Sequence, residues 1–211
     1  MRTDVLIDML AQGAGPAPQA VAARRLIPAV CLGLFMSSAI ALLMIGPLPS
    51  AMFATPAPWI KLAYSLTLAV AAAVLTARLS RPVARLAAPR TAVVSVLVAM
   101  GLVGAASLWA TPAGERAAAV LGLTWFLCPW MVMAVALPAL ATTLWAVRGL
   151  APTHLRGAGF AAGLLAGAVG AVGYSLACPE ASAAFVAVWY TAGIGLTALV
   201  GTALGPRVLR W

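Results

Sequence analysis

Residues 157–177 read GAGFAAGLLAGAVGAVGYSLA, a stretch without a single charged side chain. The hydrocarbon core of a bilayer is about 30 Å thick, and roughly 20 helical residues cross it. This stretch is therefore long and apolar enough to span a membrane. Five similar stretches lie around it, at residues 26–46, 60–79, 91–110, 119–147 and 183–205. The sequence predicts an all-α membrane protein with six transmembrane helices.

The composition agrees with a membrane protein. Hydrophobic residues make up 64% of the chain and charged residues 8%, and the mean hydropathy is +1.06. Soluble domains carry about 25% charged residues. In a soluble protein a pI of about 11.1 would suggest a nucleic-acid partner, but here the arginines lie at span ends, where they face anionic headgroups. We expect the bilayer, and no nucleic acid, as their partner.

Basic residues mark one side of the predicted membrane. Eleven of the thirteen lie before the first span, in the second and fourth connections, or after the last span: Arg2, Arg24, Arg25, Arg78, Arg81, Arg85, Arg90, Arg148, Arg156, Arg207 and Arg210. Positive residues are retained on the cytoplasmic side of a membrane. The distribution therefore predicts that both termini are cytoplasmic. The first span follows 25 residues without a cleavage motif, so we interpret it as a retained helix and not as a signal peptide.

The connections suggest how the spans pair. Residues 111–118 and 178–182 are short, and short connections favour antiparallel packing of consecutive helices. We expect three antiparallel hairpins. The chain then divides into a cytoplasmic arm at residues 1–25 and a six-helix transmembrane domain at residues 26–211.

Small residues recur in the fifth span at four-residue spacing, at Gly159, Gly163 and Gly167, and the sixth ends with Gly201 and Gly205. Such spacing lets helix backbones approach closely within a membrane. Packing of spans five and six on their neighbours is the favoured interpretation. A homodimer face is the alternative, so the oligomeric state stays open.

Residues for catalysis or ion coupling are scarce. Lys61 is expected at the outer end of span two, with its side chain extended to the interface. His154 is expected to be solvated in an inner loop, without partners for a metal site. No nucleophile–base set or carboxylate pair can be assembled, so we expect neither an enzyme nor a bound cofactor.

Two of the three cysteines are predicted at similar heights. Cys128 precedes Arg148 by 20 residues, and Cys178 follows Arg156 by 22. At 1.5 Å per residue both lie about 30–33 Å from the intervening inner turn, near the outer surface. A disulfide is attainable if they face each other, and a thiophilic metal is the other possible bridge. Packing without any interaction remains the alternative, while Cys31 is expected to be a small buried hydrophobe.

A proline follows each of these two cysteines. Proline disfavours helical geometry at the residue before it and removes one backbone donor. Pro129 is expected to kink span four beside its thiol, and Pro179 to end span five. A bond formed between the thiols could then tilt one helix against the other.

The N-terminal arm carries a short amphipathic segment. Val5, Leu6, Met9 and Leu10 share one helical face, and Gly13, Gly15, Pro16 and Pro18 then end the helix and form a linker. An isolated helix of this length is marginal in water and needs a surface. That surface is either the membrane interface or a groove on a partner protein. The acids Asp4 and Asp8 disfavour an anionic lipid surface, so a protein groove is preferred.

Landmarks spread over the whole chain resemble the NrsF family. They are RTDVLIDMLA (2–11), KLAY (61–64), TWFLCPW (124–130), ALPAL (136–140), VRGLAPT (147–153), CPE (178–180), WY (189–190) and GPRVLRW (205–211). Members are bacterial inner-membrane anti-sigma factors that negatively regulate an extracytoplasmic-function sigma factor of the SigF type. The resemblance implies that the arm and inner loops bind the sigma factor. It also implies that Cys128 and Cys178 sense metal or oxidative stress.

Two other functions remain as alternatives. A small membrane thiol-disulfide oxidoreductase could use the same cysteine pair, but it would need a quinone or a thioredoxin-like partner. A structural or transport protein could carry the cysteines incidentally.

Overall fold

The structure of the chain is a computed structural model that describes residues 3–13, 20–81 and 85–210, without the side chain of Leu6. Arg2 and the linker residues Gly15, Pro16 and Pro18 lie outside the described part. The elements in chain order are α1 (Thr3–Gly13), α2 (Val21–Ile45), η1 (Ser50–Ala54), α3 (Pro56–Leu79), α4 (Ala87–Ala110), η2 (Ala113–Glu115), α5 (Arg116–Leu121), α6 (Cys128–Arg148), α7 (Leu155–Ser175), α8 (Ala183–Phe185), η3 (Val186–Tyr190) and α9 (Thr191–Val208).

Six helices are long and apolar enough to cross a membrane. They are α2, α3, α4, α6, α7 and the continuous helix Ala183–Val208, which joins α8, the π-helical η3 and α9. All regular structure in the described ranges is helical. The predicted all-α class and the six membrane-length helices are therefore confirmed.

One span begins later than expected. The fourth was predicted at residues 119–147, but α5 ends at Leu121 and α6 begins only at Cys128. Gly122 lies between them with φ +57°, in the left-handed region that favours glycine. Its N–H donates to the Ala118 oxygen at 2.8 Å and ends α5. Hydropathy alone does not register such a turn, so the prediction merged two helices.

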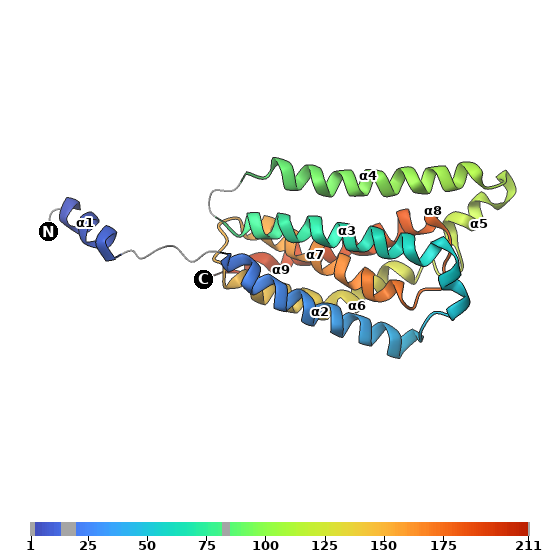
Figure 1. Cartoon of the computed structure of the whole chain (residues 1–211), viewed down its shortest axis with the longest axis horizontal. Coiled ribbons are helices and arrows are strands. Elements are labelled where there is room, and N and C mark those ends of the chain that lie inside the picture. The colour runs from blue at the N-terminus through green and yellow to red at the C-terminus, as the bar shows by residue number, and fades with distance from the viewer. Residues whose placement is uncertain (1–2, 14–19, 82–84, 211) are drawn as a thin grey trace.

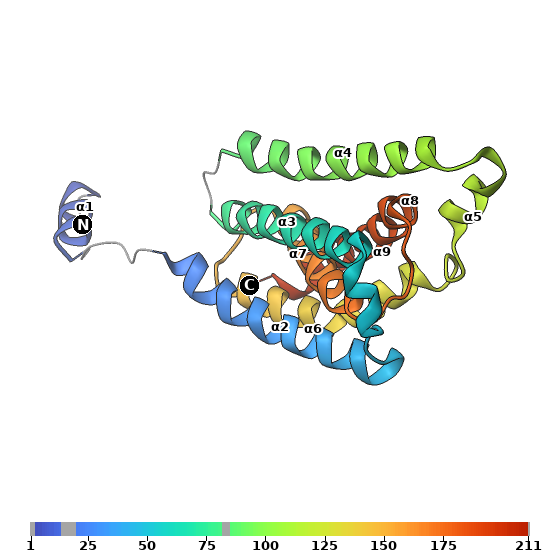
Figure 2. The ribbon, with the colours of Figure 1, turned by 45° about the vertical axis from the view of Figure 1, so that its right-hand side comes forward.

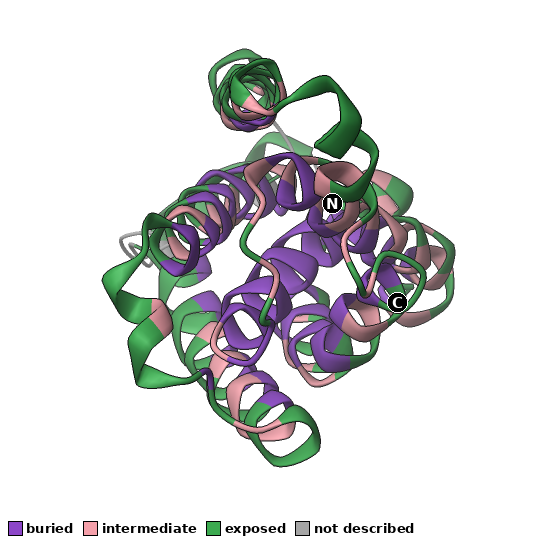
Figure 3. Cartoon of the chain, turned by 90° about the vertical axis from the view of Figure 1, so that its right-hand side faces the viewer, coloured by how far each residue is buried: buried purple, intermediate pink, exposed green. Residues whose placement is uncertain are grey.

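Helix α7 lies at the centre of the bundle, surrounded by α2, α3, α6 and α9 (Figures 1 and 2). Of its most apolar window 78% is buried, against 17% for α4, which lies at the edge against α3, α8 and η3. Figure 3 shows the buried residues gathered in the middle of the bundle and the exposed residues around its rim.

Helix α2 packs chiefly on α6 and α7, and not on α3, its successor in the chain. Ser37 Oγ donates to the Val135 oxygen at 2.9 Å, and Thr142 Oγ1 donates to the Ala29 oxygen at 2.9 Å. Helix α4 likewise packs mainly on α3, which precedes it. The expected pairing of consecutive spans into three hairpins is therefore wrong for α2 with α3 and for α4 with α6. The hydrogen bonds of Ser37 and Thr142 join α2 to α6 instead.

The glycines of α7 pack against α9. A Cβ on Gly163 would lie 2.6 Å from the Thr197 oxygen and 2.8 Å from Ala198 Cα, and one on Gly201 would lie 2.8 Å from Gly163 Cα. Only glycine permits this approach of two helix backbones. The favoured interpretation, packing within the chain, is confirmed. This stripe is covered by α9 and is not available as a homodimer face.

Cys31 lies on the outer side of α2, where it is exposed. The core-facing stripe of this helix is formed by Ala22, Leu26, Ala29, Gly33, Ser37 and Ala41. Cys31 falls off that stripe, so the expectation of a buried thiol is wrong.

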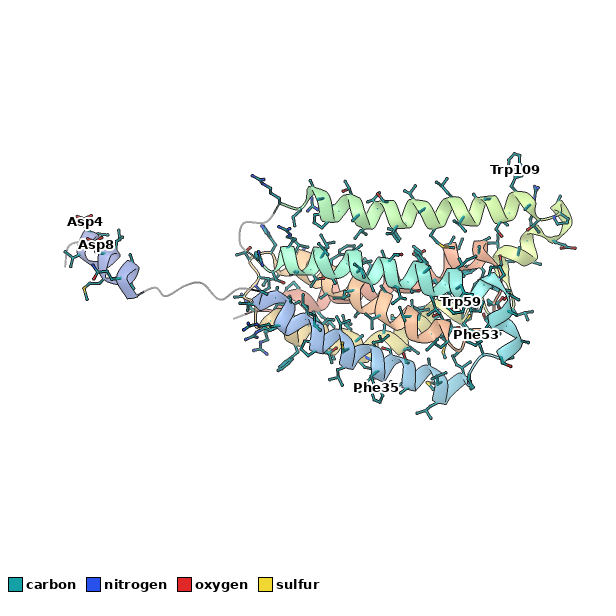
Figure 4. All side chains as sticks on the ribbon, in the orientation of Figure 1. Asp4, Asp8, Phe35, Phe53, Trp59 and Trp109 are labelled. Carbon is teal, nitrogen blue, oxygen red and sulfur yellow. The ribbon has the colours of Figure 1, made fainter. Side chains whose placement is uncertain are left out.

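The two ends of the bundle differ in chemistry. The end of α9 lies beside the start of α2 (Figure 1), and there the Arg25 guanidinium occupies the space that a Cβ on Gly149 would need. The opposite end carries aromatic residues (Figure 4): Trp109 is 87% exposed, and Trp59 Nε1 donates to the Phe53 oxygen at 3.0 Å. Tryptophans at a span end are typical of a membrane interface.

Candidate functional site

The two predicted cysteines lie at the aromatic end of the bundle. Cys128 is the first residue of α6, and its N–H donates to the Thr124 oxygen at 2.8 Å. Cys178 follows the end of α7, and its N–H donates to the Tyr174 oxygen at 3.0 Å. Both are free thiols with no exposed surface. They belong to one buried cluster and are close enough to interact electrostatically.

Two tyrosines line this thiol pair. The rings of Tyr174 on α7 and Tyr190 on η3 lie with centroids 5.6 Å apart, and both hydroxyls are near both thiols. Within the described part of the chain, the buried Tyr190 hydroxyl has no hydrogen-bond partner of good geometry. The surroundings of the thiols are therefore aromatic and buried, and the Tyr190 hydroxyl lies beside the sulfurs.

Lys61 also reaches this cluster. Its side chain has no exposed surface, and Nζ donates to the Cys178 backbone oxygen at 2.7 Å. The expectation that Lys61 extends to the interface is wrong, because this face of α3 packs on α7 and the segment after it. An ionisable group buried within a membrane span is costly and usually functional. Here it fixes the position of Cys178 relative to α3.

Glu180 ties the two Cys-Pro segments together. Its Oε1 accepts hydrogen bonds from the Leu123 N–H at 2.9 Å, the Thr124 N–H at 3.0 Å and Thr124 Oγ1 at 2.9 Å. A Cβ on Gly122 would lie 2.6 Å from Glu180 Oε2, so a larger residue would displace the carboxylate. The turn that precedes Cys128 is thus held by the residue two positions after Cys178.

The prolines act differently from the expectation. Pro129 lies in the first turn of α6, where its missing N–H costs nothing. It therefore starts the helix and does not kink it. The proline inside α6 is Pro138. Helix α7 already ends at Ser175, and Pro179 is exposed in the segment after it.

Sequence reasoning missed four members of this site: Lys61, Tyr174, Glu180 and Tyr190. Glu180 had a usable signal, because it is one of only four acids in the chain and adjoins a Cys-Pro pair. Lys61 had one too, as the single lysine in the chain, placed near the start of an apolar span. The tyrosines had none, since nothing in the sequence shows which face of their helices meets the thiols.

The chemistry of the site centres on two thiols. Among residues 3–13, 20–81 and 85–210, no group of three or more His, Cys, Asp or Glu side chains could hold a metal ion. A soft cation bound here would therefore have the two sulfurs as its protein ligands. Thiol exchange with a partner protein needs access to a sulfur. The full burial of both cysteines disfavours the oxidoreductase alternative.

The arm forms the second candidate site. Helix α1 covers Thr3–Gly13, as the amphipathic pattern predicts. The face residues Val5, Met9 and Leu10 are 50–66% exposed, and the side chain of Leu6 lies outside the described residues. Asp4 and Asp8 lie on one side of the helix (Figure 4).

Comparison with known proteins gives one consistent family. A family model described as "NrsF: Negative regulator of sigma F" matches residues 10–211, which include all six spans and the thiol cluster but only the last part of the α1 face. The chain is 38% identical over 213 residues to the probable anti-sigma-F factor NrsF of Azospira oryzae, with 100% of both chains covered. It is 36% identical over 219 residues to the anti-sigma-F factor NrsF of Caulobacter vibrioides, again with 100% of both covered. No solved structure matches the chain.

Proposed function

The chain belongs to the NrsF family of negative regulators of sigma F, and from this premise we propose that it is a bacterial inner-membrane anti-sigma factor. Its partner is an extracytoplasmic-function sigma factor of the SigF type. The two relatives that it matches over their full length are named as anti-sigma-F factors. The protein binds its partner on the cytoplasmic side and so withholds it from transcription.

The observation that carries this proposal is the exposed apolar face of α1. Val5 is 50% exposed, Met9 60% and Leu10 66%. An apolar helical face of this kind fits a hydrophobic groove on a protein partner. Asp4 and Asp8 add negative charge that can pair with basic residues beside such a groove. Together with Leu6, these residues form the proposed sigma-factor-binding surface.

The proposed orientation places both termini in the cytoplasm. The end of the bundle where α2 begins and α9 ends also holds Arg25, Arg78, Arg156 and Arg207. The aromatic end carries Lys61 and Arg116 as its basic residues, together with both described acids of the membrane domain, Glu115 and Glu180. This difference supports the positive-inside assignment. The thiol pair then lies on the periplasmic side, in an oxidising compartment.

Cys128 and Cys178 are proposed to be the sensor. Oxidation would join their sulfurs in a disulfide, with two electrons passing to the oxidant and two protons to solvent. A thiophilic divalent cation such as cadmium would instead displace both protons and bridge the sulfurs. Both routes require that the buried thiols become accessible, so the resting state reacts slowly with oxidants and metal ions.

A change at the sensor can reach the cytoplasmic end through α7. Cys178 is continuous with the end of α7, and its backbone oxygen is held by Lys61 of α3. Cys128 begins α6, which packs along α7 and α2. Closing a bond between the two sulfurs would displace the start of α6 relative to the end of α7. Since α7 contacts every other central helix, this displacement alters the basic end where the arm is attached.

Co-purification tests the proposal. Tagged full-length protein should retain its sigma factor, and Met9→Asp in the proposed binding face should weaken retention at least about tenfold, since a buried methionine contributes about 1.5–3 kcal/mol. Ala11→Asp, which adds the same charge on the opposite face of α1, is the matched control. Equal retention by both variants would exclude the α1 face as the binding surface. Failure of the unaltered protein to retain any candidate sigma factor would overturn the function itself.

A further inference from the structure

A basic groove lies where α7 begins and α9 ends. It has a volume of about 530 Å³ and is lined by Arg156, Arg207, Arg210 and Thr202, with Leu199 at its inner limit. Arg156 lies at the start of α7, Arg207 lies at the end of α9, and Arg210 follows that end. Each is exposed, so their charged groups are available to a ligand.

No acidic side chain of the described residues lines this groove. Arg207 Nη1 donates to the Ala203 oxygen at 3.3 Å, whereas the guanidinium groups of Arg156 and Arg210 make no hydrogen bond within the part of the chain that the structure describes. The chain has four acids, of which Glu115 and Glu180 lie at the opposite end of the bundle. Three guanidinium groups without an acid favour an anionic ligand, and guanidinium groups bind phosphate in a bidentate geometry.

A second, apolar groove continues from the first. It has a volume of about 600 Å³, and Leu199 lines both grooves. Its walls include Phe160 of α7, Trp130 of α6 and Leu196 of α9. The α9 residues of the two grooves, Ala192, Gly195, Leu196, Leu199, Thr202, Ala203, Pro206 and Arg207, recur at three- and four-residue spacing along one face. The grooves therefore form one channel on the lipid-facing side of α9, charged at one end and apolar beyond it.

The channel is long enough for an acyl chain of one leaflet, and its apolar part continues beyond that length to Trp125 and Trp189 near the aromatic end. Leu196 and Arg207 are 11 residues apart, which is about 16 Å along a helix. Half of the hydrocarbon core of a bilayer is about 15 Å. A ligand with a phosphate at the arginines would thus extend its apolar part to the level of Leu196, near the centre of the membrane.

We propose that this channel on α9 is a binding site for an anionic phospholipid, with the phosphate at Arg156, Arg207 and Arg210 and an acyl chain along Leu199 and Leu196. Basic pockets at the cytoplasmic ends of membrane helices are suited to anionic headgroups. A soluble anion would use only the arginines and would leave the apolar groove without a role. The helix α1, with Asp4 and Asp8 and an exposed apolar face, is the competing occupant, and the test below distinguishes it from a lipid.

Titration of the purified full-length protein in detergent tests this site. The probes are phosphatidylglycerol and, for comparison, zwitterionic phosphatidylcholine with the same acyl chains, with bound lipid counted by native mass spectrometry. We expect preferential retention of phosphatidylglycerol. Replacing Arg156, Arg207 and Arg210 with Gln should weaken its binding by about a hundredfold, since each basic residue near an anionic lipid surface contributes about fivefold. The same replacement at Arg78 of α3, Arg81 in the connection after it and Arg90 of α4, at the same basic end, should leave binding unchanged.

A second variant tests the apolar half without altering charge. Gly195→Leu should fold normally, because a Cβ there meets no atom within 4 Å, but its side chain would fill the apolar groove and reduce phosphatidylglycerol binding. Unchanged binding in both this variant and the arginine variant would overturn the proposal. Full competition by inorganic phosphate would identify an ion site and not a lipid site. Binding that appears only after residues 2–12 are deleted would assign the groove to α1, again against the proposal.

Discussion

Lys61 Nζ lies 2.7 Å from the backbone oxygen of Cys178 and donates a hydrogen bond to it from a fully buried position. The two residues are 117 positions apart in sequence. The bond connects α3 with the segment that carries one of the two proposed sensor thiols. It gives the single lysine of the chain a defined structural task, which is to hold the Cys178 backbone against α3.

Lys61→Met should loosen the Cys178 segment while the bundle still forms. The variant removes the hydrogen bond from Lys61 Nζ and leaves the buried Cys178 oxygen without this donor, which costs about 1–3 kcal/mol. Opening of the segment should become about five- to a hundredfold more frequent. The measurement is the alkylation rate of Cys178 by a membrane-permeant maleimide, with Cys31 and Cys128 replaced by Ser. Tyr64→Phe, which removes a 2.7 Å hydrogen bond to Thr191 from the same helix, is the control and should leave the rate unchanged.

Glu180→Ala should destabilise the turn before α6. The variant loses three hydrogen bonds, two of them from backbone N–H groups of Leu123 and Thr124. Thr124→Val loses one of the three, so its effect should be smaller. The apparent Tm in detergent should fall more for Glu180→Ala than for Thr124→Val. Glu115→Ala, at an exposed acid of the same end, should have no effect. An equal fall of Tm in this control would show that the change in net charge, and not the loss of the turn, destabilises the protein.

Cys128→Ser and Cys178→Ser should each abolish induction by cadmium or oxidant. A bridge needs both sulfurs, so either single replacement removes it. The readout is expression from a promoter that depends on the bound sigma factor, compared before and after the stressor. Cys31→Ser should respond like the unaltered protein, because Cys31 lies on the outer face of α2. A double variant at Cys128 and Cys178 that still responds fully would show that the stress signal enters elsewhere.

Reporter fusions should establish the orientation. A reporter active only in the periplasm should be silent when fused after Trp211 and active when inserted near Ala113, in η2 at the aromatic end. The reason is the eleven-to-two distribution of basic residues between the two sides. The opposite result would place α1 outside the cytoplasm and would exclude sigma-factor binding through it.

Gly163→Leu should destabilise the bundle, whereas Gly195→Leu should not. A Cβ on Gly163 would lie 2.6 Å from the Thr197 oxygen, which is backbone and cannot move without shifting α9. Overpacking of this kind costs about 1–3 kcal/mol or more. Gly195 has open space on the outer face of α9. Thermal unfolding followed by size-exclusion chromatography should separate the two; similar Tm values would contradict the close packing of α7 on α9.

Several elements were predictable because their signals are local. Each span is a run of apolar residues long enough for a bilayer, and the structure confirms six such helices. The glycine spacing of α7 predicted a close helix contact, which the structure places on α9. The amphipathic pattern of residues 5–10 predicted the short helix α1. The predicted start of the fourth span lies nine residues before the start of α6. The turn at Gly122 that separates α5 from α6 is held by the Glu180 carboxylate, which lies 58 positions later in the sequence, so no local signal shows it.

The sequence by itself determined the class of the protein, its six spans, its charge asymmetry and the presence of two cysteines next to prolines. Only the tertiary structure decided that α7 is central, that α2 packs on α6, and that Lys61 is buried against Cys178. The physical reason is that hydropathy reports the length of an apolar run, but a span that is apolar on all sides has no pattern to say which face meets which neighbour. That choice depends on a few side chains, such as Ser37, Gly163 and Lys61, whose partners lie far away in the sequence and are brought close only by the packed bundle.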